Sequence, residues 1–162
     1  MGKYTRLTPL GLFSSPPEEE PFGITLNSLA AAAGRQSDMI SNVEDWPAAL
    51  ISIRIKSGSS APAAGRAYKI YLIRGTGTIR DDGAGASDAA ITIENAPLLG
   101  NIIVTNSAAK NFYGIFYTGE KGIGPLGPEW GIAVKNDTDQ AISTTEADHF
   151  AGYTYIVPET DE

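Results

Sequence analysis

The 162-residue chain contains no cysteine and a single histidine, His149. Without cysteine it has no disulfide, no thiolate nucleophile and no thiolate metal ligand. A lone histidine cannot build a metal centre that needs several imidazole ligands. The sequence also lacks the Gly-x-Ser-x-Gly motif that would present a serine for a hydrolytic triad. We therefore expect no enzymatic activity, no catalytic residue and no cofactor, and we interpret His149 as a histidine at the surface or at a strand end.

Positive charge is scarce as well. The chain has 12 Lys and Arg residues against 19 Asp and Glu residues, a net charge of −7, which disfavours direct binding to nucleic acid. No apolar run approaches the roughly 18 residues of a membrane span, and the first residues lead into proline-rich sequence where a signal peptide would be apolar. The 42% of apolar residues suffice for the core of one domain. We expect one soluble domain with an extension, no export signal, and no nucleic-acid or membrane partner.

Prolines and an acidic run set residues 1–47 apart from the rest of the chain. Because proline lacks an N–H donor and favours extended backbone before it, we predict an extended N-terminal arm. A short helix is predicted near residues 26–33, with Thr25 or Asn27 as its N-cap and Gly34 able to end it. We expect apolar side chains to order the arm on a neighbouring subunit or on the chain's own domain. These candidate partner-binding residues are Phe13, Phe22, Ile24, Leu26 and Leu29.

From residue 48 to residue 158 the chain consists of short β-prone runs separated by Gly, Ser, Asn and Asp clusters. Residues 51–56 and then 67–74 alternate apolar and polar positions, as two antiparallel neighbours would. No connection is long enough for a crossover helix, which favours antiparallel pairing. We predict an all-β fold, an antiparallel and jelly-roll-like β-sandwich of about seven to eight strands, followed by an acidic C-terminal tail at residues 159–162.

Residues 127–138 form the most regular of these runs. Trp130, Ile132 and Val134 fall on one face at a period of two, and the residues between them fall on the other face, as a strand with one buried side requires. We predict that these three residues are structural anchors of the core. Trp46, directly before Pro47, is predicted to pin the arm where it joins the sandwich.

Residues 111–117 are aromatic on both faces of a predicted strand. We expect such a strand to be covered on one side by the core and on the other by a second subunit or by the arm. Together with Tyr153 and Tyr155, its rings could instead form a stacking platform for sugars, but aromatic residues at this period are more often core or subunit interface. The candidate interface aromatics are Phe112, Tyr113, Phe116 and Tyr117.

Two groups of acidic residues have the composition of weak cation sites. Asp81, Asp82 and Asp88 lie in a glycine-rich loop whose carboxylates could bind calcium, although their spacing differs from that of an EF-hand. Glu146 and Asp148 lie beside His149 and could form a weak divalent-metal pair. Because a few ligands on one loop are common by chance, we favour an exposed loop and solvated side chains, and we predict no metal site.

Several segments resemble, in the same order, those of small jelly-roll virion proteins of tailed bacteriophages. The most specific likeness is Pro128-Glu129-Trp130-Gly131-Ile132, which is similar to a Pro-Glu-x-Trp-Gly-Ile strand near the C-terminus of those proteins. The resemblance spans residues 26 to 157, and it does not extend to residues 1–25. The other matching segments lie at residues 26–30, 53–58, 68–71 and 99–102.

This resemblance implies a noncatalytic virion structural protein and brings no catalytic residue to transfer. It implies a capsid decoration or cement protein, made in the cytoplasm of a host bacterium and located on the capsid surface. The implied partner is the major capsid protein, and the implied assembly is a homotrimer, because decoration proteins commonly occupy threefold points. The alternative is a tail or fibre component acting as a receptor- or carbohydrate-binding β-sandwich module.

Overall fold

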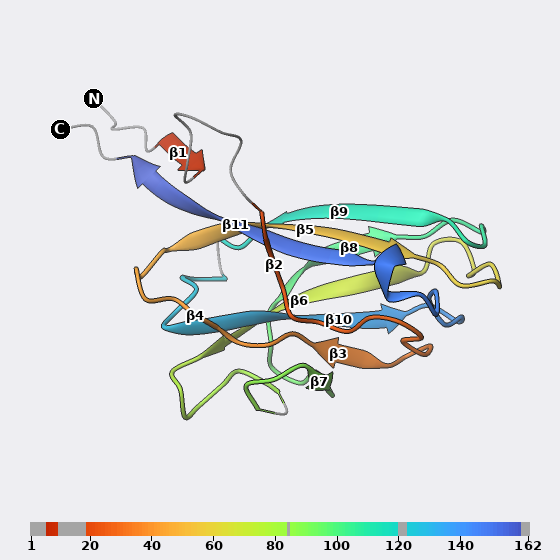
Figure 1. Cartoon of the computed structure of the whole chain (residues 1–162), viewed down its shortest axis with the longest axis horizontal. Helices are drawn as coiled ribbons and strands as arrows, with labels where there is room; N and C mark the ends of the chain where they lie inside the picture. Colours follow the sequence, from red (N-terminus) through yellow and green to blue (C-terminus); the bar gives the residue numbers. More distant parts are fainter. Residues whose placement is uncertain (1–5, 10–18, 84, 120–122, 160–162) are drawn as a thin grey trace.

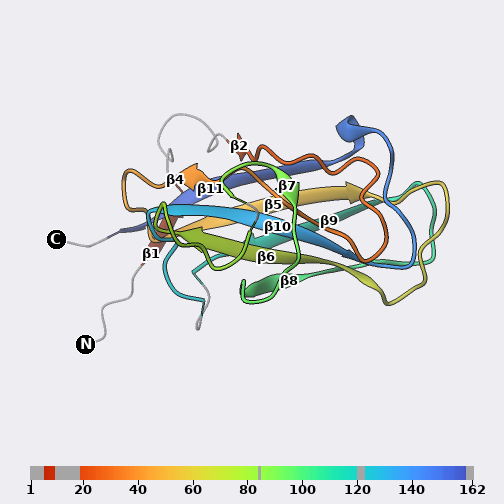
Figure 2. The ribbon, with the colours of Figure 1, turned by 90° about the horizontal axis from the view of Figure 1, so that it is seen from below.

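A computed structural model of the chain describes residues 6–9, 19–83, 85–119 and 123–159. In these residues two antiparallel sheets pack face to face, and most of the long strands run along the long axis of the molecule (Figures 1 and 2). The all-β antiparallel sandwich predicted from the sequence is therefore confirmed. No helix in the described part of the chain is long and apolar enough to cross a membrane.

Each sheet combines long strands with short ones. The first sheet has the order β1 (Arg6–Pro9), β11 (Phe150–Glu159), β5 (Ala48–Lys56) and β9 (Asn111–Tyr117), with β2 (Glu20–Pro21) also on β11. The second has the order β7 (Ala89–Ala90), β3 (Gly34–Gln36), β10 (Glu129–Asp137), β6 (Ala67–Gly75) and β8 (Leu98–Ile103), with β4 (Ile40–Ser41) also on β10. A 3-10 turn, η1 (Glu146–Asp148), precedes β11.

The strand count exceeds the prediction because of short strands. β5, β6, β8, β9, β10 and β11 are six to ten residues long and account for most of the predicted sandwich. The other described strands have two to four residues each, and β1 to β4 precede residue 48. The strand β11 also runs one residue into the predicted acidic tail, and residues 160–162 lie outside the described residues.

The core lies between the sheets and is built by alternating residues. On β5 the three isoleucines Ile51, Ile53 and Ile55 are buried, and the polar residues between them are only partly covered. On β10 the side chains of Trp130, Ile132 and Val134 are all fully buried in the same core, as their alternation predicts. The outer face of β10 is covered too, because Ala133 is buried beside Ile73 and Ala96 in a second, smaller cluster.

Aromatic rings join the two sheets around Trp130. Its indole contacts Phe22 and Tyr153 edge to face, with ring centroids 5.5 and 5.0 Å away. Trp46 is half-buried and its ring lies 6.1 Å from that of Tyr155. Trp46 therefore packs where β5 begins, at the point where the sequence places the start of the sandwich.

The helix predicted near residues 26–33 is wrong, because this segment forms two turns in which Ser28 and Ala32 have φ of 59° and 63°. Backbone groups that a helix would use internally bind the sandwich instead. Ser28 N–H donates to the carbonyl of Ser143 over 2.9 Å, and Ala32 N–H donates to the carbonyl of Asn136 over 2.7 Å. Tertiary hydrogen bonds have replaced helical ones, because a segment this short has little helical stability of its own.

The predicted arm needs a correction over residues 19–47, which belong to the sandwich. β2 pairs with β11, and both β3 and β4 pair with β10. The side chains of Phe22, Leu26 and Leu29 are buried in the main core, and Ile24 packs against it. Phe13, the remaining predicted arm residue, lies outside the described residues. Residues 19–47 thus form no arm separate from the sandwich, because their apolar side chains fill the chain's own core.

Candidate functional site

His149 is a buried strand-end residue directly before β11, and both of its ring nitrogens have partners inside the fold. Nδ1 lies 3.4 Å from the backbone N–H of Lys56, which can donate to it, and Nε2 lies 3.1 Å from the carbonyl of Ser143. These contacts suit one neutral tautomer, with the proton on Nε2. A general base must reach substrate with a free nitrogen, so this geometry gives His149 a structural role.

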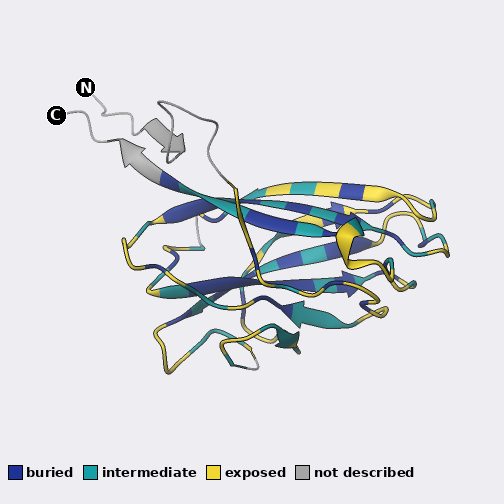
Figure 3. Cartoon of the chain, viewed as in Figure 1, coloured by how far each residue is buried: buried dark blue, intermediate teal, exposed yellow. Residues whose placement is uncertain are grey.

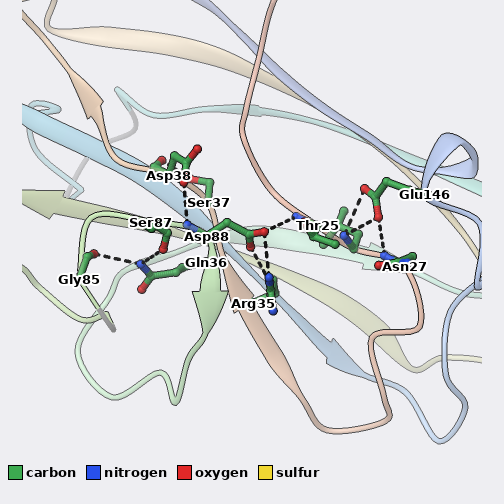
Figure 4. A network of polar contacts seen from close by, with 11 residues as sticks. Thr25, Asn27, Arg35, Gln36, Ser37, Asp38, Gly85, Ser87, Asp88 and Glu146 are labelled. Carbon is green, nitrogen blue, oxygen red and sulfur yellow. Dashed lines mark hydrogen bonds and ion pairs between the residues drawn. The ribbon is translucent and has the colours of Figure 1, made fainter.

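The two carboxylates near His149 serve different internal partners. Glu146 accepts hydrogen bonds from the backbone N–H groups of Leu26 and Asn27, over 3.0 and 2.7 Å (Figure 4). Asp148 accepts from the Ser143 hydroxyl over 2.6 Å and pairs with Lys56 over 3.0 Å, and these contacts lower the pKa of its carboxyl. Glu146 thus fastens the segment before β3, whereas Asp148 fastens the end of β5.

The three aspartates of the glycine-rich loop also have separate partners. Asp81 pairs with Arg74 over 2.8 Å. One oxygen of Asp82 accepts the backbone N–H groups of residues 94–96; partial burial favours its neutral form, but these donors lower the pKa overall. Asp88 pairs with Arg35 over 2.8 Å and accepts from Thr25 N–H over 3.1 Å. In the part of the chain that the structure describes, no group of three or more Asp, Glu or His side chains could hold a metal ion.

Figure 4 shows how Asp88 binds residues between 25 and 38, which lie at least 50 residues before it in the sequence. Its carboxylate binds Arg35 on β3 and Thr25 in the preceding turn, and its backbone N–H donates to Asp38 over 2.7 Å. Beside it, the amide of Gln36 donates to the carbonyls of Gly85 and Ser87 over 3.0 and 2.7 Å. This polar network holds the 85–88 loop against β3, so the carboxylate of Asp88 contributes to the stability of the fold.

A surface hollow of about 510 Å³ lies beside this loop, and its polar lining includes Thr78, Arg80, Asp82, Thr92 and Glu94. Among the lining residues that the structure describes, Arg80 is the one cation, and its guanidinium pairs with Glu129 over 3.0 Å. One oxygen of Asp82 accepts the backbone N–H groups of residues 94–96. No aromatic ring is present among the described residues that line the hollow, and these residues therefore offer no stacking surface of the kind typical of sugar recognition.

The strand β9 differs from the polar groups above, because it is an edge strand of the first sheet and exposes apolar side chains to solvent. It pairs with β5 on one side, and no other described strand pairs with its second side. Phe112 is buried and Phe116 packs against the core, whereas the outward-facing Tyr113 and Ile115 are 68% and 72% exposed. Figure 3 shows this exposure along β9. The strand contains no charged residue, and exposed apolar residues gathered in one place are typical of contact surfaces.

The candidate functional site is therefore the β9 edge, which we define as the outward-facing Tyr113 and Ile115 together with the free side of β9. The aromatic residues of this strand were predicted from the sequence as interface residues, whereas Ile115 was not, although the alternation over residues 111–117 places it on the same face as Tyr113. A sugar-stacking platform is not assembled, because Tyr153 and Tyr155 pack on Trp130 and Phe112 faces the core.

No family model, no curated protein and no solved structure matches this chain. The phage resemblance therefore stays a prediction made from the sequence.

Proposed function

We propose that this chain is a noncatalytic structural protein of a bacteriophage virion, which acts as a decoration or cement protein bound to the major capsid protein. The single observation that carries the proposal is the β9 edge, an uncharged and apolar surface on a well-packed sandwich. Such a surface favours contact with protein over contact with a charged or polar small molecule. The sequence resemblance adds the virion context.

The chemistry of the polar residues supports the same proposal. The side chains that were weighed as catalytic or metal-binding hold turns and loops onto the sheets, as the partners of His149, Glu146 and Asp88 illustrate. A chain whose carboxylates bind its own backbone and side chains is suited to a stabilising, noncatalytic role. The resemblance implies a homotrimer, whereas the strand pairing inferred below gives a dimer. The mass measurement described there decides between the two assemblies.

The test compares the amount of this chain with the amount of major shell protein in purified particles of the virus whose genome encodes it. A decoration protein is expected at a copy number comparable to that of the shell protein, measured by densitometry of a stained gel. A copy number far below that of the shell protein would support the tail or fibre alternative instead. Absence from the particles would contradict both virion roles.

Attachment is tested separately by adding the purified chain to particles that lack it and sedimenting them. Bound chain is expected to saturate in proportion to the shell protein, and the particles should then resist heat better. The matched control is Ile103→Lys, because Ile103 is also exposed but lies on β8, the edge strand of the second sheet. If Ile115→Lys binds as well as the unchanged chain, the β9 edge is not the attachment surface.

A further inference from the structure

We infer that the β9 edge binds the β9 edge of a second copy of this chain, so that the two strands pair antiparallel about a twofold axis at Gly114. The inference goes beyond the proposed virion role and gives the β9 edge a second copy of the chain as its partner, so that a dimer would attach to a particle through another surface. It rests on the hydrogen-bonding side of β9, on the order of its residues and on the lack of protection along its length.

The free side of β9 is identified by its register with β5. Thr118 N–H donates to the carbonyl of Ala49 over 3.0 Å at one end, and Ser57 N–H donates to the carbonyl of Lys110 over 2.9 Å at the other. Hydrogen-bonded and non-bonded pairs alternate along an antiparallel ladder, and both ends place the even-numbered residues in bonded pairs. The odd-numbered residues therefore direct their N–H and C=O groups away from β5, where no described strand pairs with them.

The facing sheet does not occupy this free side. β8 lies against the inner face of β9, where the ring of Phe116 contacts Gly100 and the side chain of Ile102 lies over Gly114. A Cβ atom at Gly114 would come within 2.7 Å of the Phe116 ring, so glycine is required there for packing within one chain. The backbone groups of Tyr113 and Ile115 remain open to a strand in the plane of the first sheet.

The order of residues in β9 is self-complementary about Gly114. In a twofold pair, Tyr113 lies opposite Ile115 of the second copy, and Asn111 lies opposite Tyr117 of the second copy. All of these residues are odd-numbered, so the free backbone groups of one strand meet those of the other. Aromatic residues opposite β-branched residues are favourable cross-strand pairs. At the axis the two Gly114 residues form the closer, non-bonded kind of pair, in which glycine leaves room.

Protection of the other sheet edges makes β9 stand out. Natural edge strands usually carry charges, prolines or bulges, or are very short, because an open edge recruits other strands. β1 contains Arg6 and Pro9, β7 has two residues, and the pairing of β8 is shifted near Ile70. β9 has seven residues in regular register, without charge or proline. Because β9 is neutral, two copies of a chain with a net charge of −7 can come into contact there without placing like charges opposite each other.

The experiment measures the molar mass of the purified full-length chain by light scattering over a wide range of concentrations. We expect a mass that rises from that of one chain, 17.1 kDa, to twice that value. Ile115→Lys should keep the thermal midpoint and raise the dimer dissociation constant at least ~10-fold, because the charge enters two symmetry-related pairs. Ile103→Lys, the matched control on β8, should dimerise like the unchanged chain.

A charge-reversal pair tests the register itself. The double variant Tyr113→Glu with Ile115→Lys places opposite charges face to face across the twofold axis, so it should recover dimers that Ile115→Lys loses, and the recovery should weaken in high salt. A chain that stays monomeric at all concentrations, forms a trimer, or dimerises undiminished with Ile115→Lys would overturn the inference. Particle binding by a monomeric chain would show that this inference had failed while the proposed virion role had not.

Discussion

The indole N–H of Trp130 donates a hydrogen bond to the hydroxyl of Tyr155 over 3.2 Å, and this contact joins β10 of one sheet to β11 of the other. Trp130 is fully buried, and its ring also packs on Phe22 and Tyr153. Burial raises the pKa of Tyr155, although the bond from Trp130 opposes this effect. The pair thus combines a large apolar contact with a satisfied polar group, and the two contributions can be separated by substitution.

Trp130→Ala is expected to lower the free energy of unfolding by about 3–5 kcal/mol, because it removes a large buried ring and leaves a cavity. Tyr155→Phe removes only the hydroxyl and should cost about 1 kcal/mol. Urea denaturation followed by circular dichroism measures both. If Trp130→Ala costs no more than Tyr155→Phe, Trp130 does not anchor the core.

Removal of residues 1–45 is expected to abolish cooperative unfolding, because it deletes Phe22, Leu26 and Leu29 from the core together with β3 and β4. Each buried side chain of this size contributes about 2–5 kcal/mol, and a whole domain has only about 5–15 kcal/mol of stability. Thermal melts followed by circular dichroism make the measurement.

The matched control removes residues 1–18 only, which retains all three buried anchors and loses the four-residue strand β1. This control should melt cooperatively. A cooperative melt of the longer deletion at the same temperature would mean that residues 19–45 form a separate arm after all.

The carboxyl group of Asp88 is expected to make the free energy of unfolding depend on pH in the acid range. Partial burial favours its neutral form, but the bonds from Arg35 and Thr25 lower the pKa of its carboxyl below 3.8 overall. A carboxyl whose pKa is lowered by folding stabilises the folded state above its unfolded pKa, and that stabilisation is lost as the pH falls through the folded pKa. Unfolding free energies from urea titrations at several pH values should therefore decline below a pH of about 4.

Asp88→Asn should cost about 1–3 kcal/mol near neutral pH, since it leaves Arg35 without its partner, and the variant should lose less stability on acidification. Asp45→Asn is the control, because Asp45 lies on an exposed turn with φ of 52° that asparagine also tolerates. If Asp88→Asn and the unchanged chain decline equally in acid, Asp88 does not contribute to the acid sensitivity.

Local patterns in the sequence predicted the strands well where one face meets the core. The alternation around Trp130 identified the inner face of β10, but it could not show that Ala133 on the other face is buried beneath the segment that contains Ala96. The turns at Ser28 and Ala32 were mistaken for a helix because their backbone partners are Ser143 and Asn136. Such hydrogen bonds between segments distant in the sequence leave no periodic signal.

The candidate site, too, was predicted from the sequence only in part. The aromatic alternation of residues 111–117 indicated a contact strand, whereas its place at the end of a sheet emerged only from the strand order. The acidic loop looked like a cation site because Arg35, the partner of Asp88, lies 53 residues away along the chain. Composition could show that carboxylates were present but could not show where their partners were.

Amide hydrogen exchange along β9, followed residue by residue by NMR, tests most directly whether its open edge is a protein contact. In dilute solution Phe112 and Gly114 should be protected by their bonds to β5, and Tyr113 and Ile115 should exchange quickly. At concentrations where the mass has doubled, exchange at Tyr113 and Ile115 should slow at least ~10-fold, because their N–H groups then bind the second copy. Exchange at Tyr113 and Ile115 that is equally fast at every concentration would contradict the pairing of β9 edges.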